Sequence, residues 1–141
     1  MKSFQIKSAL FTFLLALAIL FTGCKNDHDH DPTPHQDNSA TITITSPAEG
    51  SVVNAGQTVA ITGTISAINT LHGYNIIIRR KSDNVEIFKK EVHDHAANLT
   101  ISESWTVDAF TQHTDLELEV IATLDHDGKT ASKKVNFHAM P

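Results

Sequence analysis

Apolar and polar side chains alternate along most of the chain after residue 40. The alternation has a period of two, which places successive side chains on opposite faces of an extended strand. Seven segments carry this pattern or a weaker form of it: residues 41–45, 59–65, 74–78, 84–92, 99–107, 116–124 and 135–137. No window shows apolar residues at a sustained helical spacing. This number of short alternating segments predicts an all-β domain, a seven-stranded antiparallel β-sandwich.

Two residues within the segment 99–107 add detail to this prediction. Trp105 shares the apolar face of the strand with Leu99, and we expect its ring in the core. Glu103 interrupts the same face between Ile101 and Trp105. A carboxylate at an inward position is costly to bury, so it predicts a bulge or a strand end at this point.

The first 23 residues have the pattern of a secretory signal. Lys2 and Lys7 precede an apolar run at residues 9–21, and small residues follow it. A basic start, a short apolar stretch and small residues before a cleavage point are the parts of a signal peptide. The run is too short to span a bilayer comfortably. We therefore predict a cleaved signal peptide at residues 1–23.

The sequence Thr22-Gly23-Cys24 closes this segment and resembles the lipobox of bacterial lipoproteins. The resemblance implies cleavage before Cys24 and lipid, including palmitate, on its sulfur and its new amino terminus. Residue 25 is Lys, so the family's usual inner-membrane retention signal is absent. The acidic positions that follow resemble the export signal of surface lipoproteins in Bacteroidota-type cells: Asp27, Asp29 and Asp31. This implies an outer-membrane, lipid-anchored protein facing the cell surface. The alternative is a plain signal peptide with an incidental cysteine.

Residues 24–40 are predicted to form a disordered tether rich in His and Asp. Beyond Cys24 they contain no large apolar side chain, so they cannot bury enough surface to offset the entropy of ordering. Pro32 and Pro34 keep the middle of the segment extended. What remains, residues 41–141, has the size of one small domain.

The domain resembles a bacterial immunoglobulin-like or fibronectin-III-like module over about residues 41–139. The resemblance rests on the turn Ser46-Pro47-Ala48-Glu49-Gly50, the strand entry Gly56-Gln57-Thr58-Val59 and the strand that carries Trp105. The chain thereby resembles a histidine-rich group of Bacteroidota-type surface lipoproteins that carry a single domain of this kind. The resemblance implies the fold and no particular activity, because one sandwich fold supports many functions.

Composition and charge exclude some classes of function. The full chain has a formal charge of −5, and removing Lys2 and Lys7 leaves nine basic and sixteen acidic residues. A nucleic-acid partner needs a basic footprint, which this chain lacks. Cys24 is the only cysteine, so no intramolecular disulfide can form. Neither a Gly-x-Ser-x-Gly motif nor a His-Glu-x-x-His motif occurs, and we expect no enzymatic activity.

Histidine is unusually frequent, with nine residues, all after the predicted cleavage point. In a sandwich with immunoglobulin-like connections, successive loops alternate between its two ends. We expect His72, His93, His95 and His126 to meet at one end, while His113 and His138 fall at the other. Imidazole with carboxylate suits transition metals such as zinc and copper. Three aspartates are candidates either to hydrogen-bond to the metal-binding imidazoles or to bind the metal through oxygen: Asp94, Asp125 and Asp127.

Two functions follow from these observations. The first is an outer-membrane lipoprotein that binds a transition metal, zinc or copper, or a metal cofactor through loop histidines and passes it to an uptake receptor. The alternative is a non-enzymatic immunoglobulin-like adhesion or assembly module that binds glycan or an envelope protein and needs no cofactor. In the alternative, the loop histidines are solvated and Asp125-His126-Asp127-Gly128 is a hairpin turn.

Overall fold

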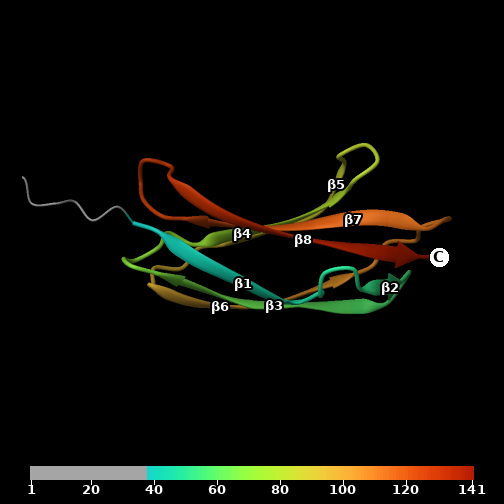
Figure 1. The fold of residues 1–141 in the computed structure, drawn as a ribbon, viewed down its shortest axis with the longest axis horizontal. Helices are drawn as coiled ribbons and strands as arrows, with labels where there is room; N and C mark the ends of the chain where they lie inside the picture. Colours follow the sequence, from blue (N-terminus) through green and yellow to red (C-terminus); the bar gives the residue numbers. More distant parts are fainter. Residues whose placement is uncertain (1–37) are drawn as a thin grey trace, which may run out of the picture. The chain divides into compact units, whose positions relative to one another are not determined.

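The computed structural model describes residues 38–141, which fold into two facing β-sheets (Figure 1). The predicted signal peptide, Cys24 and most of the tether lie outside the described residues. Eight strands are present in this part of the chain: β1 (Ala40–Ser46), β2 (Val52–Asn54), β3 (Thr58–Ala67), β4 (Tyr74–Arg80), β5 (Glu86–Val92), β6 (Asn98–Thr106), β7 (Thr114–Thr123) and β8 (Thr130–Met140). Within residues 38–141, no helix is long and apolar enough to cross a membrane.

The strands follow the immunoglobulin-like order. One sheet has the order β1-β3-β6, and the other has the order β2-β8-β7-β4-β5. Leaving β2 aside, the first, second and fifth strands of the chain form one sheet, and the third, fourth, sixth and seventh form the other. This division is that of sandwiches built from Greek-key connections. The predicted all-β sandwich is therefore confirmed at the level of its layers and its class.

The prediction of seven antiparallel strands is wrong in one respect. Strand β2 is an eighth strand and pairs with β8 in parallel, with Val53 opposite Ala139. The turn after β1 carries the chain across to the second sheet, where Gly50 donates a backbone hydrogen bond to the Asn136 oxygen at 2.7 Å. Glu49 accepts a further bond from the Asn136 backbone nitrogen at 2.9 Å. Three residues are too few for a period of two to be visible in the sequence.

The core lies between the two sheets and is built from the inward side chains of both. Ile61, Ile76, Leu118 and Phe137 have no exposed surface, and none of the polar or charged side chains at residues 38–141 is buried. Trp105 is 5% exposed, as expected from its position in the pattern. Its ring centroid lies 6.4 Å from that of Phe137, across the interface between the sheets.

The bulge or strand end expected at Glu103 does not occur. The pairing of β6 with β3 runs without interruption, and Glu103 lies opposite Ile61. Strand β6 is an edge strand, so an inward side chain there can reach the open side of the sandwich. The Glu103 carboxylate keeps 25% of its side-chain surface exposed and lies 3.9 Å from the Lys90 ammonium on β5. Because solvent reaches the Glu103 carboxylate at this edge, its inward position does not carry the cost of burying a charge, and no bulge is needed.

Gly63 marks a close approach between β1 and β3. It lies opposite Ile44, just before the pairing shifts register at Ser46. A Cβ at this position would collide with the carbonyl oxygen of Thr43. The glycine therefore allows β1 to bend where it leaves the sheet.

We predict that Trp105→Ala lowers the free energy of unfolding by about 3–5 kcal/mol, because it leaves a large cavity between the sheets. Thermal or denaturant unfolding of the purified protein measures this loss. Val85→Ala is the control, since Val85 is 44% exposed and lies between strands. Equal effects of the two changes would contradict the placement of the Trp105 ring in the core.

Candidate functional site

Backbone hydrogen bonds tie three loops together at one end of the sandwich. The three are the β3–β4, β5–β6 and β7–β8 loops. In the β3–β4 loop, His72 donates to the Thr123 oxygen at the end of β7 at 2.9 Å, and Leu71 donates to the Ala96 oxygen in the β5–β6 loop at 3.1 Å. Gly73 follows with a φ of 111°, and a Cβ there would collide with the carbonyl oxygen of Val92. Glycine is thus required for the loop to approach β5 so closely.

The four histidines expected at this end lie together, and we call them the four-histidine cluster. The ring centroids of His72 and His126 are 3.8 Å apart, and those of His72 and His95 are 5.0 Å apart. His93 and His95 are joined more directly, with 2.9 Å between their Nε2 atoms. The cluster is therefore a continuous series of ring contacts that begins at His126 and ends at His93.

A shallow depression of about 440 Å³ lies over the cluster. Its lining residues are the four histidines with Glu91, Thr123, Asp125 and Gly128. Partial burial lowers the pKa of His72, and the neighbouring imidazoles lower it further, chiefly that of His126. The lowered pKa favours the neutral form of His72, in which imidazole can coordinate a metal.

Of the three aspartates expected to support this cluster, one lines the depression. Asp125 is that residue, but its Oδ1 accepts hydrogen bonds from the backbone nitrogens of Asp127 at 3.0 Å and Lys129 at 2.9 Å. It thereby shapes the β7–β8 turn. Asp94 and Asp127 are exposed and do not line the depression.

The sequence placed the segment with Glu91 at this end but assigned Glu91 no role, although it lines the depression. It precedes His93 by two residues, and alternation in an extended segment places both on the same side. That spacing was the available signal.

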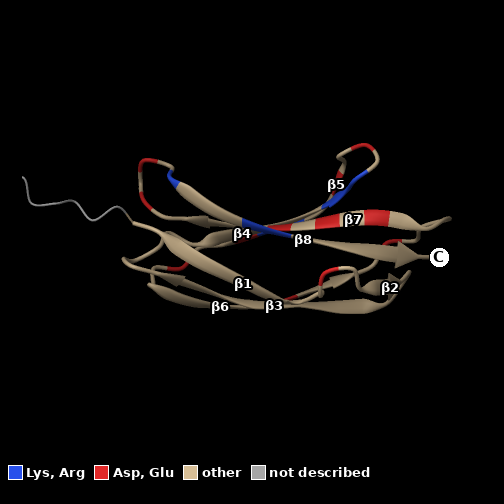
Figure 2. Cartoon of the chain, viewed as in Figure 1, with Lys and Arg blue, Asp and Glu red and all other residues tan. Residues whose placement is uncertain are grey.

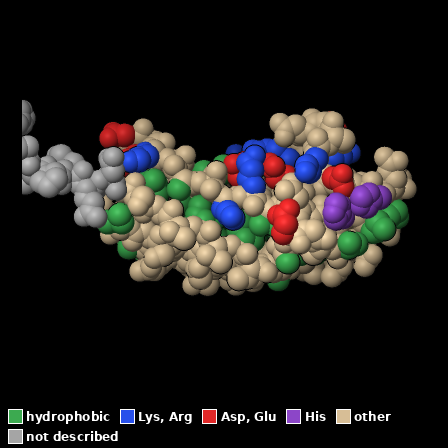
Figure 3. Space-filling view, in the orientation of Figure 1, with side chains coloured by type: hydrophobic (Ala, Val, Ile, Leu, Met, Phe, Trp, Pro, Cys, Tyr) green, Lys and Arg blue, Asp and Glu red, His purple; other side chains and the backbone are tan. Residues whose placement is uncertain are grey.

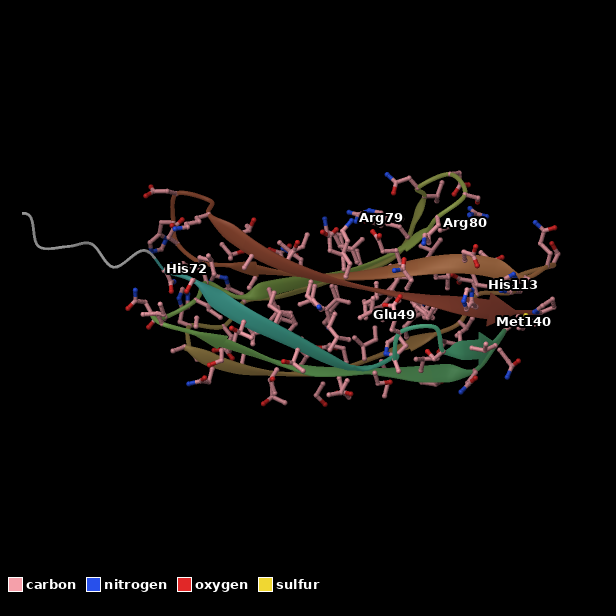
Figure 4. All side chains as sticks on the ribbon, viewed as in Figure 1. Glu49, His72, Arg79, Arg80, His113 and Met140 are labelled. Carbon is pink, nitrogen blue, oxygen red and sulfur yellow. The ribbon has the colours of Figure 1, made fainter. Side chains whose placement is uncertain are left out.

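A second group of potential ligands lies at the opposite end of the sandwich. Figure 4 shows His72 and His113 at the two ends. His113, Asp115 and His138 form the one group of three at residues 38–141 whose ligand atoms all lie within 4.8 Å of one another. A hydrogen bond with His138 lowers the pKa of the Asp115 carboxyl, and the charges of His113 and His138 act in the same direction. The sequence placed both histidines at this end but assigned no role to Asp115.

The outer faces of the two sheets differ in charge. The five-stranded sheet carries ion pairs between neighbouring strands, including Arg79–Glu119 at 2.7 Å and Lys134–Glu117 at 2.8 Å. In Figure 2 the acidic and basic residues gather on this sheet, while β1 and β3 carry none. Thirteen outward positions of the three-stranded sheet are uncharged, and we call them the neutral face: Thr41, Thr43, Thr45, Thr58, Ala60, Thr62, Thr64, Ser66, Asn98, Thr100, Ser102, Ser104 and Thr106.

No protein family and no curated protein matches this chain. Solved structures with a similar fold include the fibronectin(III)-like modules of Clostridium thermocellum CbhA. The match has 17% identity over 70% of this chain and 94% of that chain, with a TM-score of 0.46. A CARDB domain from Pyrococcus furiosus, solved in complex with di-metal ions, matches at 10% identity over 74% and 94%, with a TM-score of 0.41. Murine CRIg matches at 13% identity over 72% and 97%, also with a TM-score of 0.41.

Proposed function

We propose that this chain is a non-enzymatic immunoglobulin-like adhesion or assembly module, held at the outer membrane by lipid on Cys24. The neutral face is the observation that carries the proposal. The chain as a whole is acidic, with a formal charge of −5. An acidic envelope partner is therefore repelled less by the neutral face than by the rest of the molecule.

The neutral face is also well ordered for binding. Its short side chains hydrogen-bond across strands: Thr45 with Thr62 at 2.8 Å, and Ser66 with Asn98 at 2.8 Å. Short side chains already held in place lose little rotamer entropy when a partner covers them. The long Lys, Arg and Glu side chains of the opposite sheet would lose more. A hydroxyl-rich face suits a polar partner that supplies hydrogen bonds over a broad area.

We expect a photoreactive residue at Thr64, near the middle of the neutral face, to capture a partner in intact cells. The same residue at Ser132 is the matched control, since Ser132 is an exposed small polar residue on β8 of the other sheet. Gel analysis of irradiated cells should show an adduct that depends on the position of the probe. Adducts from Ser132 alone, or none from Thr64, would contradict a contact through this face.

The lipid anchor is tested separately. Cys24→Ser removes the sulfur that the lipobox resemblance predicts to be acylated. We expect loss of fatty-acid labelling and release of the protein from the membrane fraction, which metabolic labelling and fractionation measure. Retention of the serine variant in the membrane would overturn the anchor while leaving the neutral face untested.

Metal binding by the four-histidine cluster is a second candidate function. The ring contacts between His72, His93, His95 and His126 support it, as does the lowered pKa of His72. Imidazole nitrogens from three loops could share a zinc or copper ion after small rotations of the side chains. Such a protein could pass the ion to an uptake receptor.

We predict that His93→Ala with His95→Ala abolishes zinc or copper binding at this end. Affinity should also fall as the pH drops through the histidine range near about 6.5, because protons compete for the imidazole nitrogens. Isothermal titration at several pH values measures both effects. All titrations use a background that carries His113→Ala, so that ligands at the far end do not contribute, and Asp127→Asn in the same background is the control. Unchanged affinity in the double variant would leave the adhesion or assembly module as the function.

A further inference from the structure

The opposite end of the sandwich holds its own set of ligand groups, the triad His113, Asp115 and His138. Asp115 on β7 lies directly opposite His138 on β8. His113 immediately precedes β7, and its side chain lies near that of Asp115. The neighbours Leu116 and Phe137 are fully buried, which fixes Asp115 and His138 on the outer side of the sheet. Figure 3 shows histidine side chains beside an acidic one at this end.

The distances within the triad are close to those of a metal site. His138 Nδ1 lies 2.7 Å from Asp115 Oδ1, and His113 Nε2 lies 3.8 Å from the same oxygen. The two imidazole rings are stacked, with their centroids 5.0 Å apart. Tetrahedral zinc with bonds of about 2.0–2.2 Å holds its ligand atoms about 3.3 Å apart. All three ligand atoms lie within 4.8 Å of one another, so side-chain rotation would bring them to that spacing.

We infer that His113, Asp115 and His138 bind a zinc ion through two imidazoles and one carboxylate. This ligand set suits a borderline divalent metal, and three protein ligands leave a fourth position for water or another small ligand. Two of the three ligands lie on adjacent paired strands, so they are held more rigidly than ligands on loops. The site depends on neither the neutral face nor the four-histidine cluster.

The open position has room for a small ligand. A cavity of about 440 Å³ adjoins the triad, lined by His113 and Asp115 together with Arg80, Lys81 and Phe110. Lys81 is held there because its backbone nitrogen donates to the backbone carbonyl oxygen of Asp115 at 2.9 Å. Arg80 is already paired with Asp83 at 3.0 Å, so Lys81 is the lining residue whose charge favours an anion, such as a carboxylate, as the fourth ligand of the zinc.

The test is zinc titration of the full chain in detergent, with His28, His30 and His35 replaced by Asn in every variant so that they do not compete. Affinity is measured by competition with a chromophoric chelator. Asp115→Asn keeps the size of the side chain but removes its charge. We expect it to weaken one zinc site by more than the roughly 10- to 100-fold that loss of an outer partner causes. His113→Ala with His138→Ala should remove the same site.

Two control variants locate the effect. Asp127→Asn removes an exposed aspartate at the other end, and His93→Ala with His95→Ala disrupts the four-histidine cluster; both should keep the site. Cobalt in place of zinc should give the visible absorption of tetrahedral coordination, and Asp115→Asn should abolish it. Circular dichroism checks folding, and if the double histidine variant unfolds, the near-isosteric Asp115→Asn decides. Zinc affinity and cobalt spectra unchanged by Asp115→Asn would overturn the inference.

Discussion

Burial of one apolar face from each sheet against the other is the constraint on which the rest of this structure depends. Each square ångström of apolar surface removed from water contributes about 25 cal/mol, and polar groups gain nothing comparable there. Among residues 38–141, every fully buried large side chain is accordingly apolar, apart from Tyr74 with its hydroxyl group. Burial raises the pKa of the Tyr74 phenol, and the nearby Glu103 and Asp94 carboxylates act in the same direction. The groups that could bind a partner or a metal lie on outer faces, sheet edges and loops.

The path of the chain then sorts the histidines into two groups of different construction. The four-histidine cluster is assembled from three loops, which are held by backbone hydrogen bonds and by the Asn38 side chain, bonded to both Leu124 and Asn69. The triad at the other end takes two of its members from paired strands, where the ladder fixes their separation. A strand-borne site needs less reorganisation to bind a ligand, whereas a loop-borne site adapts more easily to ligands of different size.

The outer face of the five-stranded sheet is charged, whereas the outer face of the three-stranded sheet is neutral. Ion pairs such as Arg79–Glu119 contribute little to stability because both partners keep contact with solvent. Their effect is on association, since charged faces and edges discourage unwanted pairing. The strands β1 and β6 that border the neutral face are both edge strands, and of the two only β6 carries a charge, at the inward Glu103. A partner that covers this face would also shield those edges.

The sequence by itself determined the sandwich, its core and the grouping of the histidines. A period of two at residues 59–65 or 116–124 fixes which side chains face inward, because each strand obeys the same local geometry. Alternating loop ends then place His72, His93, His95 and His126 together.

Only the tertiary structure decided the parallel strand β2, the unbroken strand at Glu103 and the contact of Asp115 with His138. Each depends on which distant segment lies alongside and in which register. Strand β2, with Val53, pairs with the edge of β8, and the Glu103 carboxylate contacts solvent at the edge of the sandwich. The β7–β8 register decides that the partner of Asp115 is a histidine. Long-range pairing leaves no local trace, so composition and periodicity could not reveal it.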